Sequence, residues 1–306
     1  MADHEMIHIA NDTLSAAINS FGAELTHLRD ADGRELMTDA DPAFWTGRAP
    51  ILFPIVGAVN GDVIRIHGHA YPMKKHGFAR RSAFELIDRQ PDRATFRLDD
   101  SEETRAVFPF AFALDIGFAL DGATLAITAT IANTGDRPMP AQFGFHPGFA
   151  WPLPYGQDRA AHRIVFEHDE PGGIRQLSGD GLIMLAERPS PLHASAEHPP
   201  EPGSLAGREL ILGDDLFSAD ALIWDQVRSQ SVRYGAGEGP HLVIDFPDTP
   251  RLGIWTRPGG QYVCIEPWHG IADPEGFTGE FRDKPGVFVV APGDSKRIGM
   301  SVTLTA

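Results

Sequence analysis

The sequence predicts an all-β protein built as an antiparallel sandwich. Short segments alternate apolar and polar residues, which is the pattern of half-buried strands. Glycine and proline, with 32 and 25 of 306 residues, exceed their usual combined share of about 12% and separate these segments. No long stretch shows convincing helical spacing of apolar residues. Many short strands without helices between them favour a sandwich.

The predicted strands occur along the whole chain. In residues 124–131, Leu125, Ile127, Ala129 and Ile131 fall on one face of a strand, because side chains alternate. The other strand predictions, in chain order, are residues 93–98, 112–118, 241–246, 287–290 (a buried type of run) and 297–305.

The domain organisation predicted from this pattern is a single domain, residues 1–306. A proline-rich stretch, residues 187–207, interrupts the pattern. The strand pattern is similar on both sides of it, so we expect an excursion loop. The alternative is a linker between two domains.

Composition excludes several classes of partner. Lys and Arg total 26 and Asp and Glu total 42, a formal net charge of −16, which repels nucleic acid and anionic lipid. No apolar run approaches the roughly 20 residues that span a bilayer, and residues 1–10 lack the pattern of a signal peptide. The one cysteine, Cys264, allows no intrachain disulfide or thiolate cluster and fits a reducing cytoplasm.

The first segment with functional side chains is residues 76–80. If it is extended, His76, Phe78 and Arg80 share one face. An imidazole, an apolar ring and a guanidinium together would suit a sugar, or a phosphate bound by the arginine. The alternative is a surface strand with a structural histidine.

The second segment is residues 143–149, FGFHPGF. Pro147 favours an extended conformation at His146. His146 then lies between Gly144 and Gly148, whose missing side chains would leave room for a ligand, while the phenylalanines anchor the other face. The alternative is a core histidine.

The third segment is residues 262–268, YVCIEPW. Val263 and Ile265 point one way, and Cys264 and Glu266 the other. A carboxylate at the end of an apolar strand is partly desolvated, which makes it a useful general base. Trp268 could stack on a pyranose ring. The alternative for Glu266 is an edge-strand salt bridge.

Other chemistries have weaker support. Asp220 interrupts an apolar stretch and either caps a turn or faces a polar pocket. His67 and His69 form a His-x-His pair, but the glutamate of a cupin-like metal site does not follow, so we expect no metal site. Phosphate-binding loops, dinucleotide fingerprints and nucleophile elbows are absent from the sequence.

These segments together resemble the aldose 1-epimerase (galactose mutarotase-like) superfamily. The similarity also includes Asp41-Pro42-x-x-Trp45 and residues 50–57, PILFPIVG, and extends nearly end to end. It implies a large antiparallel β-supersandwich, no cofactor and a small-molecule sugar as partner. Exposed edge strands would allow a monomer or a homodimer.

The resemblance also implies roles for residues. His146 would be the general acid and Glu266 the general base of anomer interconversion, with His76 and Asp220 binding the sugar. The HGFAR form of residues 76–80 resembles a bacterial branch of the family. It also occurs in hexose-6-phosphate mutarotases, where an equivalent of Arg80 helps to hold phosphate.

Departures from the galactose mutarotase pattern keep alternatives open. No arginine lies in residues 54–59, and a Leu-His-Gly-Gly segment is missing. The sugar could therefore be free or phosphorylated. A non-catalytic sugar-binding protein on the same fold is the alternative function, and a lyase or hydrolase is a third. The presence of both His146 and Glu266 favours the mutarotase.

Overall fold

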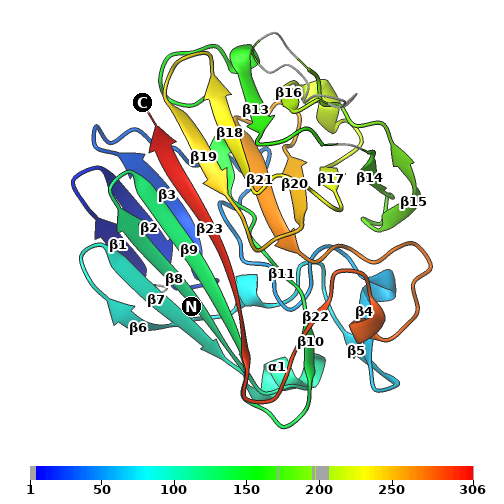
Figure 1. Ribbon diagram of the computed structural model, residues 1–306. Coiled ribbons are helices and arrows are strands. Elements are labelled where there is room, and N and C mark those ends of the chain that lie inside the picture. The colour runs from blue at the N-terminus through cyan, green and yellow to red at the C-terminus, as the bar shows by residue number, and fades with distance from the viewer. Residues whose placement is uncertain (1–4, 171, 195–196, 198–206, 306) are drawn as a thin grey trace.

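The computed structural model describes residues 5–170, 172–194, 197 and 207–305, and consists mainly of antiparallel strands (Figure 1). Its larger sheet has nine strands. In spatial order they are β16 (Glu209–Ile211), β13 (His162–Phe166), β18 (Ser231–Ala236), β19 (His241–Asp245), β23 (Ser295–Thr305), β9 (Thr124–Asn133), β8 (Phe112–Asp121), β7 (Arg93–Asp99) and β6 (Glu85–Arg89).

The second large sheet has seven strands and carries the candidate site. Its order is β11 (Phe143–Gly144), β21 (Tyr262–His269), β20 (Arg251–Trp255), β17 (Leu222–Trp224), β14 (Ile174–Leu177) and β15 (Ile183–Arg188), with β12 (Gly148–Ala150) also paired to β21.

Alongside short 3-10 helices, the remaining β-strands and the α-helix of the described residues form smaller elements. They are the sheet of β1 (Met6–Ala10), β2 (Leu14–Asn19) and β3 (Glu24–Asp30), the pairs β4 (Val63–Ile66) with β5 (His69–Pro72) and β10 (Met139–Ala141) with β22 (Phe288–Val290), and the helix α1 (Glu102–Val107). Ser101 begins this helix with a capping box. Among the described residues no helix is long and apolar enough to cross a membrane.

The antiparallel β-sandwich predicted from the sequence is confirmed, and each predicted strand is present within a few residues. β23 pairs with β19 on one side and β9 on the other, and so joins strands from both halves of the chain (Figure 1). One hydrophobic core includes side chains of both large sheets, such as Ile127 of β9 and Ile265 of β21.

The proline-rich excursion is only partly described. β15 ends at Arg188, and His193 forms a bridge with Glu209 at the start of β16. Residues 195–196 and 198–206, where the loop was predicted, lie outside the described residues.

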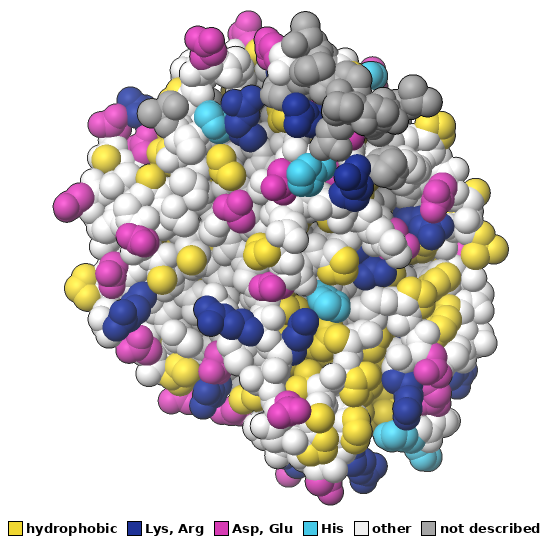
Figure 2. All heavy atoms as spheres, in the orientation of Figure 1, with side chains coloured by type: hydrophobic (Ala, Val, Ile, Leu, Met, Phe, Trp, Pro, Cys, Tyr) yellow, Lys and Arg dark blue, Asp and Glu magenta, His cyan; other side chains and the backbone are white. Residues whose placement is uncertain are grey.

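Charged side chains are distributed over the surface. On the face shown in Figure 2, acidic and basic side chains are interspersed, and the described residues form no continuous basic patch on it.

Strand alternation gives the seven-stranded sheet two different faces. Val263 and Ile265 of β21 and Ile254 of β20 point into the main core. Trp268 of β21 and Ile223 of β17 point to the opposite face, where a smaller apolar cluster also includes residues of the loops at 52–56 and 271–272. The candidate site lies on this second face.

Candidate active site

A cavity of about 580 Å³ opens on the second face of the seven-stranded sheet. Six of the seven side chains predicted from the sequence line it, although they come from distant parts of the chain: His76, Arg80, His146, Asp220, Glu266 and Trp268. Phe78 is the exception.

Glu266 is placed by the alternation of β21. It shares a face with Cys264 and Trp268, whereas Val263 and Ile265 enter the main core, as the sequence predicted. Only 2% of Glu266 is exposed. The strand therefore holds a carboxyl group at the wall of the cavity, almost without solvent.

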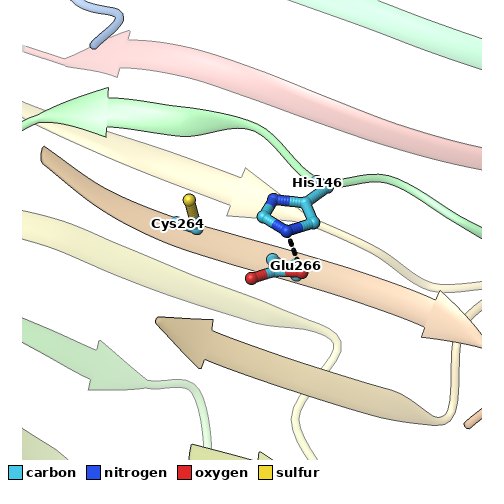
Figure 3. A group of neighbouring side chains, drawn as sticks. All are labelled: His146, Cys264 and Glu266. Atoms are coloured by element: carbon cyan, nitrogen blue, oxygen red, sulfur yellow. Dashed lines mark ion pairs between the residues drawn. The ribbon is translucent and has the colours of Figure 1, made fainter. Parts of the chain in front are cut away.

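His146 lies between β11 and β12 and is fixed beside Glu266 by backbone hydrogen bonds on either side of it. Phe145 N–H donates to Pro267 O, and Ile265 N–H donates to Pro147 O. The His146 Nε2 atom lies 3.1 Å from Glu266 Oε2, and Figure 3 shows this contact. The two groups are within direct proton-transfer distance.

The space beside His146 differs from the sequence prediction. Gly144 and Gly148 do not leave room for a ligand, because tryptophan side chains occupy it. A Cβ at Gly144 would lie 2.6 Å from Trp268, and one at Gly148 would lie 2.9 Å from Trp45. The glycines thus admit two indoles that line the cavity.

Aromatic rings enclose the His146 imidazole. Trp45 stacks on it with ring centroids 5.1 Å apart and an interplanar angle of 26°, and Trp255 meets it edge-on at 6.1 Å. Neither tryptophan was predicted to belong to the site. The only signal for Trp45 was its place in the Asp-Pro-x-x-Trp motif, and for Trp255 its alternation with Gly253 at the end of a strand.

Burial shifts the pKa values of the central pair in opposite directions. It lowers the pKa of His146 to about 3, with Arg80 and Lys75 adding to the effect. Burial raises the pKa of Glu266 well above its ordinary value, and Asp220 adds to this, while Lys75, the nearby Trp268 indole and Arg80 oppose it. Burial therefore favours the neutral form of both groups, with the proton on Glu266 rather than on His146.

Residues 76–80 are not the extended strand that the sequence suggested. His76 and Gly77 both have positive φ, 68° and 71°, and Ala79–Arg81 form a 3-10 helix. Gly77 is required there, because a Cβ would lie 2.1 Å from Phe53 O. The turn still brings His76 and Arg80 to the cavity.

His76 is held in one tautomer. Gly57 N–H donates to His76 Nδ1 at 3.1 Å, so the neutral ring carries its proton on Nε2. Burial, followed by the proximity of His146, puts the pKa of His76 well below its usual range. His76 is thus a neutral N–H donor at the cavity wall.

The prediction that Phe78 offers its ring to a sugar needs correction. The turn directs this ring into the core, where its centroid lies 5.9 Å from those of Phe53 and Phe112. It does not line the cavity. The shared face of positions 76, 78 and 80 was lost with the extended conformation.

Asp220 both stabilises a turn and faces the cavity, which were the two alternatives predicted from the sequence. It has positive φ, 70°, and its Oδ1 accepts a hydrogen bond from Ala221 N–H at 2.8 Å, which stabilises the turn before β17. It also lines the cavity. One carboxylate oxygen remains for a ligand.

Cationic side chains that the sequence analysis did not single out line the same cavity. Lys75 and Arg81 lie there with Arg80, and within the described chain none of the three forms an ion pair with a carboxylate. Burial, together with Arg81, lowers the pKa of Arg80. Arg257 also lines the cavity and donates to Phe44 O.

One group of side chains could hold a metal ion. A ligand atom from each of His146, Cys264 and Glu266 lies within 4.8 Å of the others, and Figure 3 shows the three side chains together. The Cys264 thiol is fully buried, as expected for a mid-strand cysteine.

Comparisons with known proteins agree with the predicted family. The family model described as aldose 1-epimerase matches residues 5–177. The plasmid and chromosomal forms of protein LacX from Lactococcus lactis subsp. lactis are each 29% identical over 307 residues, covering 97% of this chain and 99% of theirs.

Solved structures show the same relationship. A galactose mutarotase related enzyme from Lactobacillus acidophilus superposes with a TM-score of 0.86 at 30% identity, covering 99% of this chain and 98% of its own. A galactose mutarotase-like protein from Lactobacillus casei ATCC 334 has a TM-score of 0.84 at 28% identity, covering 98% and 100%.

Proposed function

The chain belongs to the aldose 1-epimerase family, and from this premise we propose that it interconverts the α and β anomers of an aldose. The observation that carries the proposal is the 3.1 Å contact between His146 and Glu266 at the wall of a sugar-sized cavity. Anomer interconversion needs one proton donor and one acceptor near the O5–C1 bond. A buried pair that shares one proton supplies both.

The reaction proceeds through the open-chain sugar. Glu266 as the carboxylate takes the proton of the anomeric hydroxyl, and protonated His146 gives a proton to the ring oxygen. The C1–O5 bond breaks, the C1–C2 bond rotates, and the ring closes on the other face with the two roles reversed. Each proton transfer typically contributes about 10²–10⁴-fold. The chemistry requires no metal, redox cofactor or nucleotide.

The tautomer favoured by the pKa shifts fits the same cycle. A neutral His146 and a protonated Glu266 contain the same number of protons as the ionised pair, and they are the state of the pair once the ring has opened. Stacking of the imidazole on Trp45 at 5.1 Å favours the imidazolium and so reduces the difference between the two tautomers.

The sugar would be held by groups around this pair. His76 Nε2–H donates to a hydroxyl, and the free Asp220 oxygen accepts from another. Trp268 and Trp255 present apolar surfaces on which a pyranose ring can pack.

An aldose with an anionic group fits the cavity better than a neutral one. Lys75, Arg80 and Arg81 form no ion pair with a carboxylate among the described residues; Arg80 is half-buried, and the other two are exposed at the cavity. Lysine and arginine bind phosphate and carboxylate groups through charge-assisted hydrogen bonds. A phosphate or carboxylate on the sugar would supply the missing charge. We therefore include a phosphorylated aldose in the proposed substrate class.

Exchange spectroscopy of anomers tests the proposal. A panel of free and 6-phosphorylated aldoses is measured by NMR with the wild-type protein, and faster exchange for at least one sugar is expected. Binding without faster exchange for any sugar would favour the alternative, a non-catalytic sugar-binding protein.

A further inference from the structure

We propose that His146, Cys264 and Glu266 form a binding site for a thiophilic divalent transition metal such as Zn²⁺, and that metal bound there blocks the proton-transfer pair. One ligand atom from each residue lies within 4.8 Å of the other two. The blocking effect rests on the proposed function, whereas the metal site itself does not.

The fold gives the three donors fixed positions. Cys264 and Glu266 are two residues apart on β21 and so project from the same face of the strand. His146 comes from the segment between β11 and β12, whose backbone is bonded to β21 on both sides of it. Gly148 is the register partner of Cys264, and a Cβ there would lie 3.4 Å from Sγ and 2.9 Å from the Trp45 ring, which occupies the space beside the sulfur.

The donor set is one that zinc prefers. Imidazole nitrogen, thiolate sulfur and carboxylate oxygen are its three common protein ligands, at about 2.0–2.3 Å from the metal. In a tetrahedral site such ligands lie about 3.5 Å apart. The His146–Glu266 contact of 3.1 Å is near this spacing, and small side-chain rotations would bring in Sγ. His146 and Glu266 line the adjoining cavity, so a fourth ligand could reach the metal from that side.

The charged groups around the three donors affect how strongly a metal cation would bind. A thiolate and a carboxylate together offset the two charges of the metal, and Asp220 adds a negative charge nearby. Lys75 and Arg80 oppose the cation. They also favour an anion at the open metal position, so a metal with an anionic co-ligand is the expected occupant.

Metal binding and anomer interconversion compete for the same atoms. A metal on His146 and Glu266 takes the lone pairs that would accept protons from the sugar. Mutarotation should therefore fall as the site fills and return when a chelator removes the metal.

Titration with Co²⁺ after treatment with a chelator tests the site without any assay of activity. Tetrahedral cobalt bound to a thiolate gives a near-ultraviolet charge-transfer band. The chain has one cysteine, so this band can come only from Cys264. We expect the band in the wild type and no band in Cys264→Ser, or in Cys264→Ala if the serine variant does not fold.

The ligand role of Glu266 has its own measurement. Glu266→Gln keeps the thiolate and should keep the band, with an affinity for Co²⁺ at least about tenfold weaker. If this variant binds Co²⁺ with the same affinity as the wild type, Glu266 is not a metal ligand. Absence of the band in the wild type would overturn the proposal.

Inhibition is measured separately with Zn²⁺, and Mg²⁺ serves as the control cation. Zn²⁺ should inhibit the wild type and inhibit Cys264→Ser at least about tenfold less. Equal inhibition of both proteins would overturn the blocking role. A cobalt band in a protein without mutarotase activity under metal-free conditions would support the site and contradict the proposed function.

Discussion

At the residue scale, burial determines where the proton of the central pair lies. Both His146 and Glu266 are almost completely removed from solvent, and burial disfavours the charged form of each. A surface pair of the same residues would be an ordinary ion pair. Here burial favours the neutral form of both groups, whose Nε2 and Oε2 atoms lie 3.1 Å apart.

This neutral pair makes stability depend on pH in a predictable direction. The unfolded Glu266 carboxyl ionises above its ordinary pKa of 4.5, but the folded one keeps its proton to higher pH. The folded state thus binds more protons, and the contribution of Glu266 to stability falls as pH rises. A glutamine at position 266 does not ionise, so its contribution to stability does not fall as pH rises. We expect the free energy of unfolding of Glu266→Gln, relative to wild type, to increase from pH 5 to pH 8 by at most about 1.4 kcal/mol per pH unit, and its relative melting temperature to rise with it.

Thermal unfolding of both proteins across this pH range checks the expectation. Gln90, which is exposed after β6, provides the control through Gln90→Ala, which adds or removes no titratable group and should change the melting temperature equally at each pH. A difference for Glu266→Gln that does not change with pH would show that the Glu266 carboxyl is not held protonated.

Arg81 allows a second prediction at this scale. If the unpaired cations bind an anionic group, Arg81→Ala should raise KM for a phosphorylated aldose by about ten- to a hundredfold, the value of a hydrogen bond to a charged group. KM for the free aldose should change little. Arg89, exposed on β6, is the matched control, and Arg89→Ala should alter neither value. Equal loss for both sugars in Arg81→Ala would contradict a role in anion binding.

At the element scale, three neighbouring strands build the site by alternation. β17, β20 and β21 each direct one set of side chains into the main core and the other set to the cavity face. The sequence predicted the two faces of β21 correctly, because alternation depends only on local conformation. It did not predict that the space at Gly144 and Gly148 is filled, because the tryptophans come from other segments.

Trp268 lies in a slot between two glycines of adjacent strands. A Cβ at Gly253 of β20 would lie 2.5 Å from its ring, and one at Gly144 would lie 2.6 Å from it. Gly253→Ala should therefore displace the indole, reduce the free energy of unfolding by about 1–3 kcal/mol and weaken sugar binding. Denaturant unfolding and sugar titration measure the two effects.

Gly117 of β8 is the control for this substitution. A Cβ there would meet Thr95 Oγ1 at 3.6 Å, an ordinary contact, so Gly117→Ala should leave stability and binding nearly unchanged. If Gly253→Ala behaves like Gly117→Ala, the slot does not position Trp268.

The turn at residues 76–81 shows where local prediction fails. His76 and Gly77 adopt left-handed conformations, which interrupt the alternation of side chains expected for a strand. Gly77 lies close to Phe53 O, and this is a contact between segments distant in the sequence. A pattern of residues in one segment does not contain that information. The assumed strand assigned His76, Phe78 and Arg80 to the site together. The family resemblance gave separate roles to His76 and Arg80 alone, and these two line the cavity.

At the scale of the whole molecule, the fold class and the family could be predicted from the sequence, but the charge of the cavity could not. The chain has a net charge of −16, yet its cavity contains Lys75, Arg80, Arg81 and Arg257. These side chains converge only when the loops dock on the seven-stranded sheet. The net charge of a chain does not indicate which charged side chains the fold brings together in one cavity.

The extent of the hydrophobic core bears on the domain organisation. One core cluster extends from Ile7 in β1 to Val302 in β23 and includes side chains of both large sheets. We propose on this basis that the chain folds as one domain, with the site on the seven-stranded sheet and the loops that dock on it.

The most direct test of the central claim is the rate of anomer exchange, measured by NMR at equilibrium, for wild type and Glu266→Gln at equal concentration. We expect the wild type to accelerate exchange for at least one free or phosphorylated aldose. We also expect a loss of at least about 10²-fold in a folded Glu266→Gln variant. Exchange at the wild-type rate in that variant would contradict the assignment of Glu266 and, with it, the proposed mechanism.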